Sequence, residues 1–118
     1  MGFNLYTNGS DGQVSSIDDM DLFAQALLSD SIVSSESLGL MRQVYSNLEQ
    51  GYYGYGWFRG ARFEDSFTAG GSMDGFESIF IIEPSIELQY IGLSNGGQRT
   101  GAHLNNIYAL INRFYSQE

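Results

Sequence analysis

The chain has 118 residues, enough for one modest hydrophobic core, and we expect a single domain over residues 1–118. Five basic residues against fourteen acidic ones give a net charge of −9. Such an acidic surface repels phosphate backbones, which excludes nucleic acid as an expected partner. The absence of cysteine excludes disulfides, thiolate catalysis and zinc–cysteine sites. We expect no cofactor and no metal.

The apolar residues do not form a membrane span. No apolar run approaches the roughly 20 residues that a spanning helix needs. The first residues, Met1–Tyr6, have neither the basic segment nor the long apolar stretch of a signal peptide. With 42% apolar residues, however, the chain is too apolar to be disordered. We therefore expect a folded chain without a membrane span, and the sequence leaves its compartment open.

The first third of the chain predicts a loop and two helices. Residues 1–12 are rich in Gly, Asn, Ser and Asp, which is typical of a loop. Ser16 followed by two aspartates is typical of a helix start, because the hydroxyl caps free amides and the carboxylates lie at the positive end of the helix dipole. Apolar residues at helical spacing then predict a helix over about 17–29. Ser34 begins a second helix in the same way, and Gly51 ends it or lies in the loop after it.

The middle of the chain predicts strands. Aromatic residues alternate with glycine over Tyr52–Phe58, which indicates a strand with one bulky face. A more polar strand is predicted over Arg62–Thr68 and is broken by the run Ala69–Ser72. Two further strands are predicted over Ser78–Glu83 and Leu88–Ser94. The first of these two is apolar on both faces and is therefore expected at the centre of the sheet.

The last predicted element is a helix over about Ala102–Tyr115, with five apolar residues on one face. The order helix, helix, strands, helix predicts an α+β fold. We expect an antiparallel meander of three to four strands, covered by the N-terminal and C-terminal helices.

Four stretches carry a family resemblance by their order and spacing. They are the helix start Gly12–Met20 with the helical residues after it, the strand Tyr53–Trp57, the glycine-rich run Gly70–Phe76, and the last hairpin with Ile82–Pro84 and Ile91–Asn95. Together they resemble the C-terminal third of the serine β-lactamase and penicillin-binding protein (DD-peptidase) family, in its class C and esterase-like branch. The resemblance covers about residues 9–115 and implies the C-terminal half of a β-lactamase-like fold.

The resemblance also implies what the chain lacks. Acyl transfer in this family needs a serine with a lysine three residues later, a tyrosine or equivalent base, and a strand that begins with lysine or histidine. This chain contains no lysine, and the resemblance puts the serine, lysine and tyrosine boxes before residue 1. The run Ala69, Gly70, Gly71 and Ser72 takes the place of the third element. Ala69 stands where the lysine or histidine would be, and a methyl group neither orients a carboxylate nor passes a proton.

The backbone of that third element still has a role, since the amide of Ser72 can point at an oxyanion. The alternative interpretation is that Gly70 and Gly71 form a strand-ending turn. Following the resemblance, we expect the C-terminal part of a serine hydrolase that acts on a peptidoglycan peptide, a β-lactam or an ester, and that is not catalytically competent alone. The expected partner is the missing N-terminal half of the parent, or a second copy through oligomerisation or domain swapping.

Two alternatives stay open. The chain can be a stand-alone, non-catalytic binding or interaction module derived from that fold. It can also be an unrelated small α+β domain, which would be indicated if the predicted strands did not pair in one antiparallel sheet. The family is commonly exported or associated with the cell envelope, although this chain shows no signal peptide.

The remaining candidate site residues have simpler interpretations. His103, the only histidine, begins the last predicted helix, where a surface or capping role is favoured over catalysis. The carboxylates of Asp18, Asp19 and Asp21 lie at consecutive helical positions and do not converge on one ion, so a solvated helix start explains them. Trp57 and the tyrosines beside it can form a sugar-stacking face, but we expect core packing.

Overall fold

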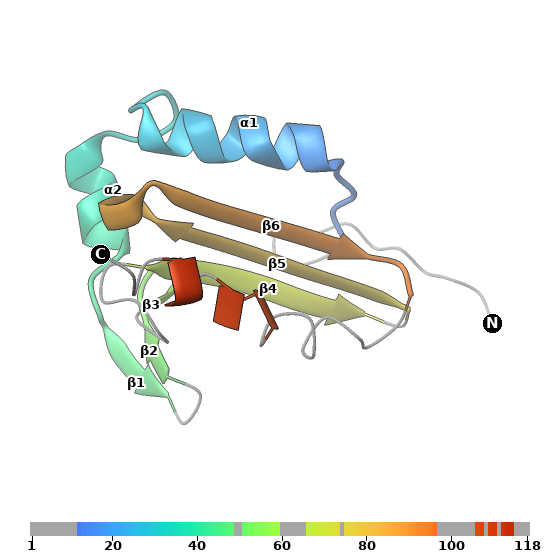
Figure 1. Ribbon diagram of the computed structural model, residues 1–118. Coiled ribbons are helices and arrows are strands. Elements are labelled where there is room, and N and C mark those ends of the chain that lie inside the picture. Colours follow the sequence, from blue (N-terminus) through green and yellow to red (C-terminus); the bar gives the residue numbers. More distant parts are fainter. Residues whose placement is uncertain are drawn as a thin grey trace.

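In the computed structural model, the described residues are 12–48, 51–59, 66–73, 75–96, 106–107, 109–110 and 112–114. They form two helices followed by one antiparallel sheet whose strands lie side by side in chain order (Figure 1). The elements are α1 (Ile17–Leu28), α2 (Ser35–Met41), β1 (Ser46–Leu48), β2 (Gly51–Tyr53), β3 (Phe58–Arg59), β4 (Phe67–Met73), β5 (Phe76–Glu83), a 3-10 turn η1 (Pro84–Ile86) and β6 (Leu88–Ser94). The predicted α+β class and the antiparallel sheet are confirmed.

Both helices begin where the sequence predicts. The Ser16 hydroxyl accepts the backbone N–H of Asp19 at 3.1 Å, and the Ser34 hydroxyl accepts that of Ser37 at 3.2 Å. Each cap satisfies an amide that has no partner inside the helix, which fixes the first turn. Helix α1 ends at Leu28, within one residue of the prediction.

The second helix is shorter than the sequence predicts. It ends at Met41, and the residues after it join the sheet: β1 pairs with β2, and the N–H of Tyr45 donates to the carbonyl of Tyr53 at 3.0 Å. Gly39 weakens the helix from within. The valine and tyrosine that follow the helix favour extended backbone, so sheet pairing takes over.

The sheet has six strands over the described residues, against the three to four predicted. The single strand expected over Tyr52–Phe58 is in fact the end of β2 and the start of β3, joined by a tight turn. Gly56 in that turn has a φ of 81°, a conformation that glycine adopts without strain. The N–H of Gly54 donates to the carbonyl of Trp57 at 2.8 Å and closes the turn.

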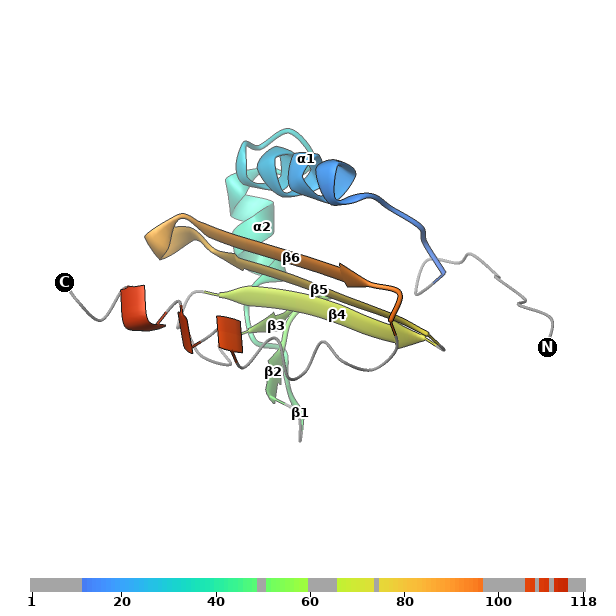
Figure 2. The ribbon, with the colours of Figure 1, turned by 45° about the vertical axis from the view of Figure 1, so that its right-hand side comes forward.

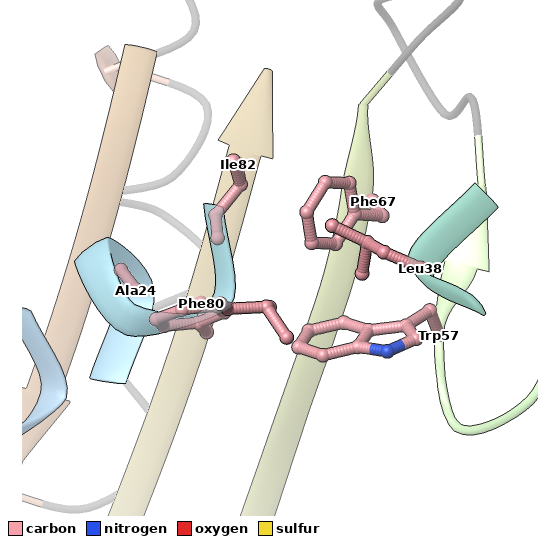
Figure 3. Packing of buried hydrophobic residues seen from close by; sticks show 7 residues of the cluster. Ala24, Leu38, Trp57, Phe67, Phe80 and Ile82 are labelled. Atoms are coloured by element: carbon pink, nitrogen blue, oxygen red, sulfur yellow. The ribbon is translucent and has the colours of Figure 1, made fainter. Parts of the chain in front are cut away.

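The core lies between the two helices and one face of the sheet (Figure 3). Its buried members are Ala24, Leu27, Leu38, Trp57, Phe67, Phe80 and Ile82. The ring of Trp57 meets the ring of Phe67 edge to face at 5.0 Å and that of Phe80 at 5.8 Å. Trp57 is thus a core residue, as expected, and it joins α2 to the centre of the sheet.

Strand β5 is central, as its apolar pattern predicts. It pairs with β4 on one side and with β6 on the other, and its last four residues are buried. Residues two apart point to the same face, so Phe80 and Ile82 face the helices while Ile81 faces the opposite side.

The predicted last helix is only partly described. Residues 106–107, 109–110 and 112–114 are helical and lie on the side of the sheet away from α1 (Figure 2), and the rest of that range falls outside the described residues. Leu110 and Phe114 are 54% and 77% exposed, so the apolar face that the sequence predicts for this helix is not buried at these two residues. Of the predicted loop over residues 1–12, only Gly12 is described, and it belongs to no helix or strand.

The aromatic core should dominate the stability. We expect Phe67→Ala, which removes a fully buried ring, to lower the free energy of unfolding by about 3–5 kcal/mol. The matched change Phe114→Ala, at an exposed ring, should alter it by less than about 0.5 kcal/mol. Urea unfolding followed by tryptophan fluorescence measures both, and equal losses would contradict the described core.

A second matched pair tests the junction between α2 and β2. A Cβ at Gly54 would collide with the carbonyl oxygen of Met41 and lie 2.8 Å from that of Gln43, and both atoms belong to the backbone. We expect Gly54→Ala to destabilise the fold by about 1–3 kcal/mol. Gly39→Ala in α2 meets no atom within 4 Å and should stabilise the fold by up to about 1 kcal/mol. Urea unfolding gives the free energy of unfolding of both variants. A Gly54→Ala protein as stable as the parent would contradict the close contact between Gly54 and the residues after α2.

Candidate functional site

The run Ala69, Gly70, Gly71 and Ser72 lies inside strand β4. Its four residues pair in register with Phe80, Ile79, Ser78 and Glu77 of β5. The prediction that this run breaks the strand is therefore wrong, and so is the alternative of a turn at the two glycines. The turn comes later, at Gly75, whose φ is 85°. Pairing along the whole of β5 outweighs the weak strand preference of glycine.

The two glycines of β4 differ in their surroundings. A Cβ at Gly70 would lie 3.2 Å from the carbonyl oxygen of Ser78 and 3.3 Å from Cδ1 of Ile79. A Cβ at Gly71 would meet only the Ser78 hydroxyl, at 3.5 Å. Because Gly70 has no side chain, the Ile79 side chain can lie close to β4. Gly71, on the face that packs against the helices, has little side-chain cover over its backbone.

Among the described residues, one edge of β4 has no partner strand over most of its length. Strand β3 pairs only with Phe67 and Thr68, and beyond them no described strand lies on that side (Figure 1). In an antiparallel pair, alternate residues direct their N–H and C=O groups away from the partner strand. Part of the Ala69–Met73 backbone therefore has donors and acceptors with no partner strand among the described residues, the kind of edge to which an extended peptide can add.

The side chains of β4 offer little chemistry. Ala69 pairs with Phe80 and packs against the core on the face that carries α1 and α2. Ser72 is exposed, and within the described part of the chain its hydroxyl has no hydrogen-bonded base that would activate it. The strand can bind through its backbone, but its own side chains cannot move a proton.

A cavity of about 380 Å³ lies beside η1, where β5 turns into β6. It is lined by Leu28, Ile82, Glu83, Pro84, Glu87, Leu88 and Gln89. Glu83 is 1% exposed, and its Oε1 accepts the Ser85 N–H at 3.0 Å and the Ser85 hydroxyl at 2.6 Å. Its Oε2 is buried without a hydrogen-bond partner. The carboxylate serves as the cap of η1 through Oε1, and Glu83 is also one of the residues that line the cavity.

Sequence reasoning did not single out Glu83 as a buried group. The available signal is the acid placed directly before the proline of a turn, since an acidic side chain there can bond the amide two residues on. Glu83 is also buried because β5 pairs with β4 and β6 along its length. A local sequence pattern does not reveal such long-range pairing.

The acidic residues at the start of α1 are engaged within the helix. Asp19 accepts a hydrogen bond from the Ser16 hydroxyl at 2.9 Å, and Asp21 accepts one from the Gln25 amide at 2.7 Å. Across the described ranges, no three histidine or carboxylate side chains gather closely enough to hold a metal ion. No described helix is long and apolar enough to cross a bilayer. His103 lies outside the described residues.

Comparison with known proteins adds no identification. No protein-family model, no curated protein and no solved structure matches the chain.

Hydrogen exchange tests the open edge of β4. We expect alternate amides from Ala69 to Met73 to exchange rapidly, because they point away from β5. The amides of Ile79–Ile82 in β5 should all exchange slowly, since β5 has a partner on both sides. Proton–deuterium exchange followed by NMR gives residue-level rates. Uniformly slow exchange from Ala69 to Met73 would mean that the edge is covered.

Proposed function

We propose that this chain is the C-terminal part of a serine hydrolase of the serine β-lactamase and penicillin-binding protein family. In this proposal it contributes the strand that lines the substrate groove, and it does not catalyse acyl transfer by itself. The substrate class of the parent is a peptidoglycan peptide, a β-lactam or an ester.

The observation that carries the proposal is the meander of β4, β5 and β6. The glycine-rich stretch of the resemblance spans the β4–β5 hairpin, its acid–proline pair lies at the β5–β6 turn, and its serine–asparagine pair lies at the end of β6. This distribution of the three stretches over one sheet agrees with what the resemblance implies and supports the proposal. The joint pairing of all described strands in that sheet also favours this proposal over an unrelated α+β domain.

The open edge of β4 supports a binding role for this strand. A backbone with unpaired donors can hold an extended peptide or an acyl oxygen without any charged side chain. Ala69 supplies neither a charge nor a proton, so the nucleophile and the base of the reaction must come from other residues of a longer polypeptide.

A second candidate function is a stand-alone binding module without catalysis. The methyl group of Ala69, where the family has lysine or histidine, favours it, as does Ser72 without a base in the described residues. Both functions predict an inert isolated chain, and they differ in what precedes this chain in the intact gene product.

Catalytic incompetence is tested with activated-serine probes. The chain is incubated with a fluorescent penicillin and, separately, with a fluorophosphonate, and its intact mass is measured. We expect an unchanged mass, because the chain has no lysine to activate a serine and Ser72 has no hydrogen-bonded base within the described residues. An active penicillin-binding protein serves as the positive control. Stoichiometric acylation of this chain would overturn the claim.

A further inference from the structure

The residues that follow β6 include an asparagine directly before a glycine. Strand β6 ends at Ser94, which pairs with Glu77 of β5, and Asn95 and Gly96 form a bend beyond that last pair (Figure 1). Both residues of the bend are exposed to solvent. No described strand therefore holds the peptide bond between Asn95 and Gly96.

An asparagine side chain in such a place can react with its own backbone. The nucleophile is the backbone nitrogen of the next residue, and the electrophile is the Cγ carbon of the asparagine amide. A side chain on the next residue crowds the attacking nitrogen, whereas glycine has none and leaves the backbone free to reach the ring-closing geometry. Asparagine is for this reason among the thermolabile residues of proteins.

The surroundings of Gly96 leave this attack open. Among the described residues, a Cβ at Gly96 would meet only the Ser94 hydroxyl, at 3.6 Å. The Asn95 amide has no hydrogen-bond partner in the described part of the chain, so it can turn toward the Gly96 nitrogen. The Gly96 N–H donates to the Ser94 hydroxyl at 3.2 Å. One bond to a neutral acceptor slows the reaction by about tenfold at most.

We propose that Asn95 deamidates spontaneously in the folded chain. The Gly96 nitrogen attacks Cγ of Asn95, and a nitrogen–carbon bond forms while the bond between Cγ and Nδ2 breaks. The proton of the Gly96 N–H leaves with Nδ2 as ammonia, which gives a succinimide. Water then adds to either carbonyl of that ring and opens it to aspartate or isoaspartate at position 95.

This reaction changes the end of the β5–β6 hairpin. The succinimide nitrogen carries no hydrogen, so the bond from Gly96 to the Ser94 hydroxyl is lost when the ring closes. The product adds one negative charge to a chain whose net charge is −9, directly after the pair of Ser94 with Glu77. Isoaspartate also lengthens the backbone by a methylene group. The inference does not depend on the proposed function, since it uses neither β4 nor a substrate.

Peptide mapping by mass spectrometry measures the loss of each asparagine amide separately, so the other Asn–Gly pair, Asn8–Gly9, does not interfere. The full chain is kept in mildly alkaline buffer, folded or unfolded in guanidinium chloride. We expect Asn95 in the folded chain to react at a rate within about tenfold of that in the unfolded chain. Asn47, inside β1 and followed by leucine, should keep its amide in the folded chain. A folded chain in which Asn95 also keeps its amide would overturn the proposal.

A matched pair of glycine variants identifies the attacking nitrogen. Gly96 has no positive φ, and a Cβ there makes an ordinary contact, so Gly96→Ala should fold. We expect its methyl group to slow the loss of the Asn95 amide by at least about tenfold, because it crowds the attacking atom. Gly39→Ala in α2, which meets no atom within 4 Å, should leave that rate unchanged. Equal rates in the two variants would mean direct hydrolysis of the side chain and would overturn the attack by Gly96.

Discussion

Trp57 packs against the rings of Phe67 and Phe80, and this aromatic contact lies at the centre of the hydrophobic core. It joins the turn after β2 to the central strands, and through Leu38 and Ala24 it fixes both helices on one face of the sheet (Figure 3). The orientation of β4 follows, because burying Phe67 on that face puts Ala69 and Gly71 on it as well. The candidate site therefore takes its position from this core contact together with the backbone pairing of β4 and β5.

A meander covered in this way leaves its edges open. Each described strand pairs only with its neighbours in sequence. Beyond Thr68 no described strand pairs with the outer edge of β4, and none pairs with the outer edge of β6.

Local sequence patterns predicted the parts of the fold that depend on interactions between residues close in sequence. The helix starts at Ser16 and Ser34 follow from side-chain capping, and the central place of β5 follows from an apolar run buried on both faces. The patterns failed where strand pairing between residues distant in sequence determines the local structure. The residues after Met41 leave the helix because β2 is available to them, and Gly70 and Gly71 stay extended because β5 holds them. For the candidate site, the sequence predicted a strand break at Ala69–Ser72, whereas these residues lie inside β4.

We propose that this chain is one part of a serine hydrolase, and the DNA upstream of the Met1 codon tests that proposal. We expect an open reading frame in phase with this chain that encodes a serine-x-x-lysine box and, after it, a tyrosine box. Those two boxes would supply the nucleophile and base that β4 lacks. A longer frame without the boxes, or a translation start at Met1 behind a stop codon, would contradict it.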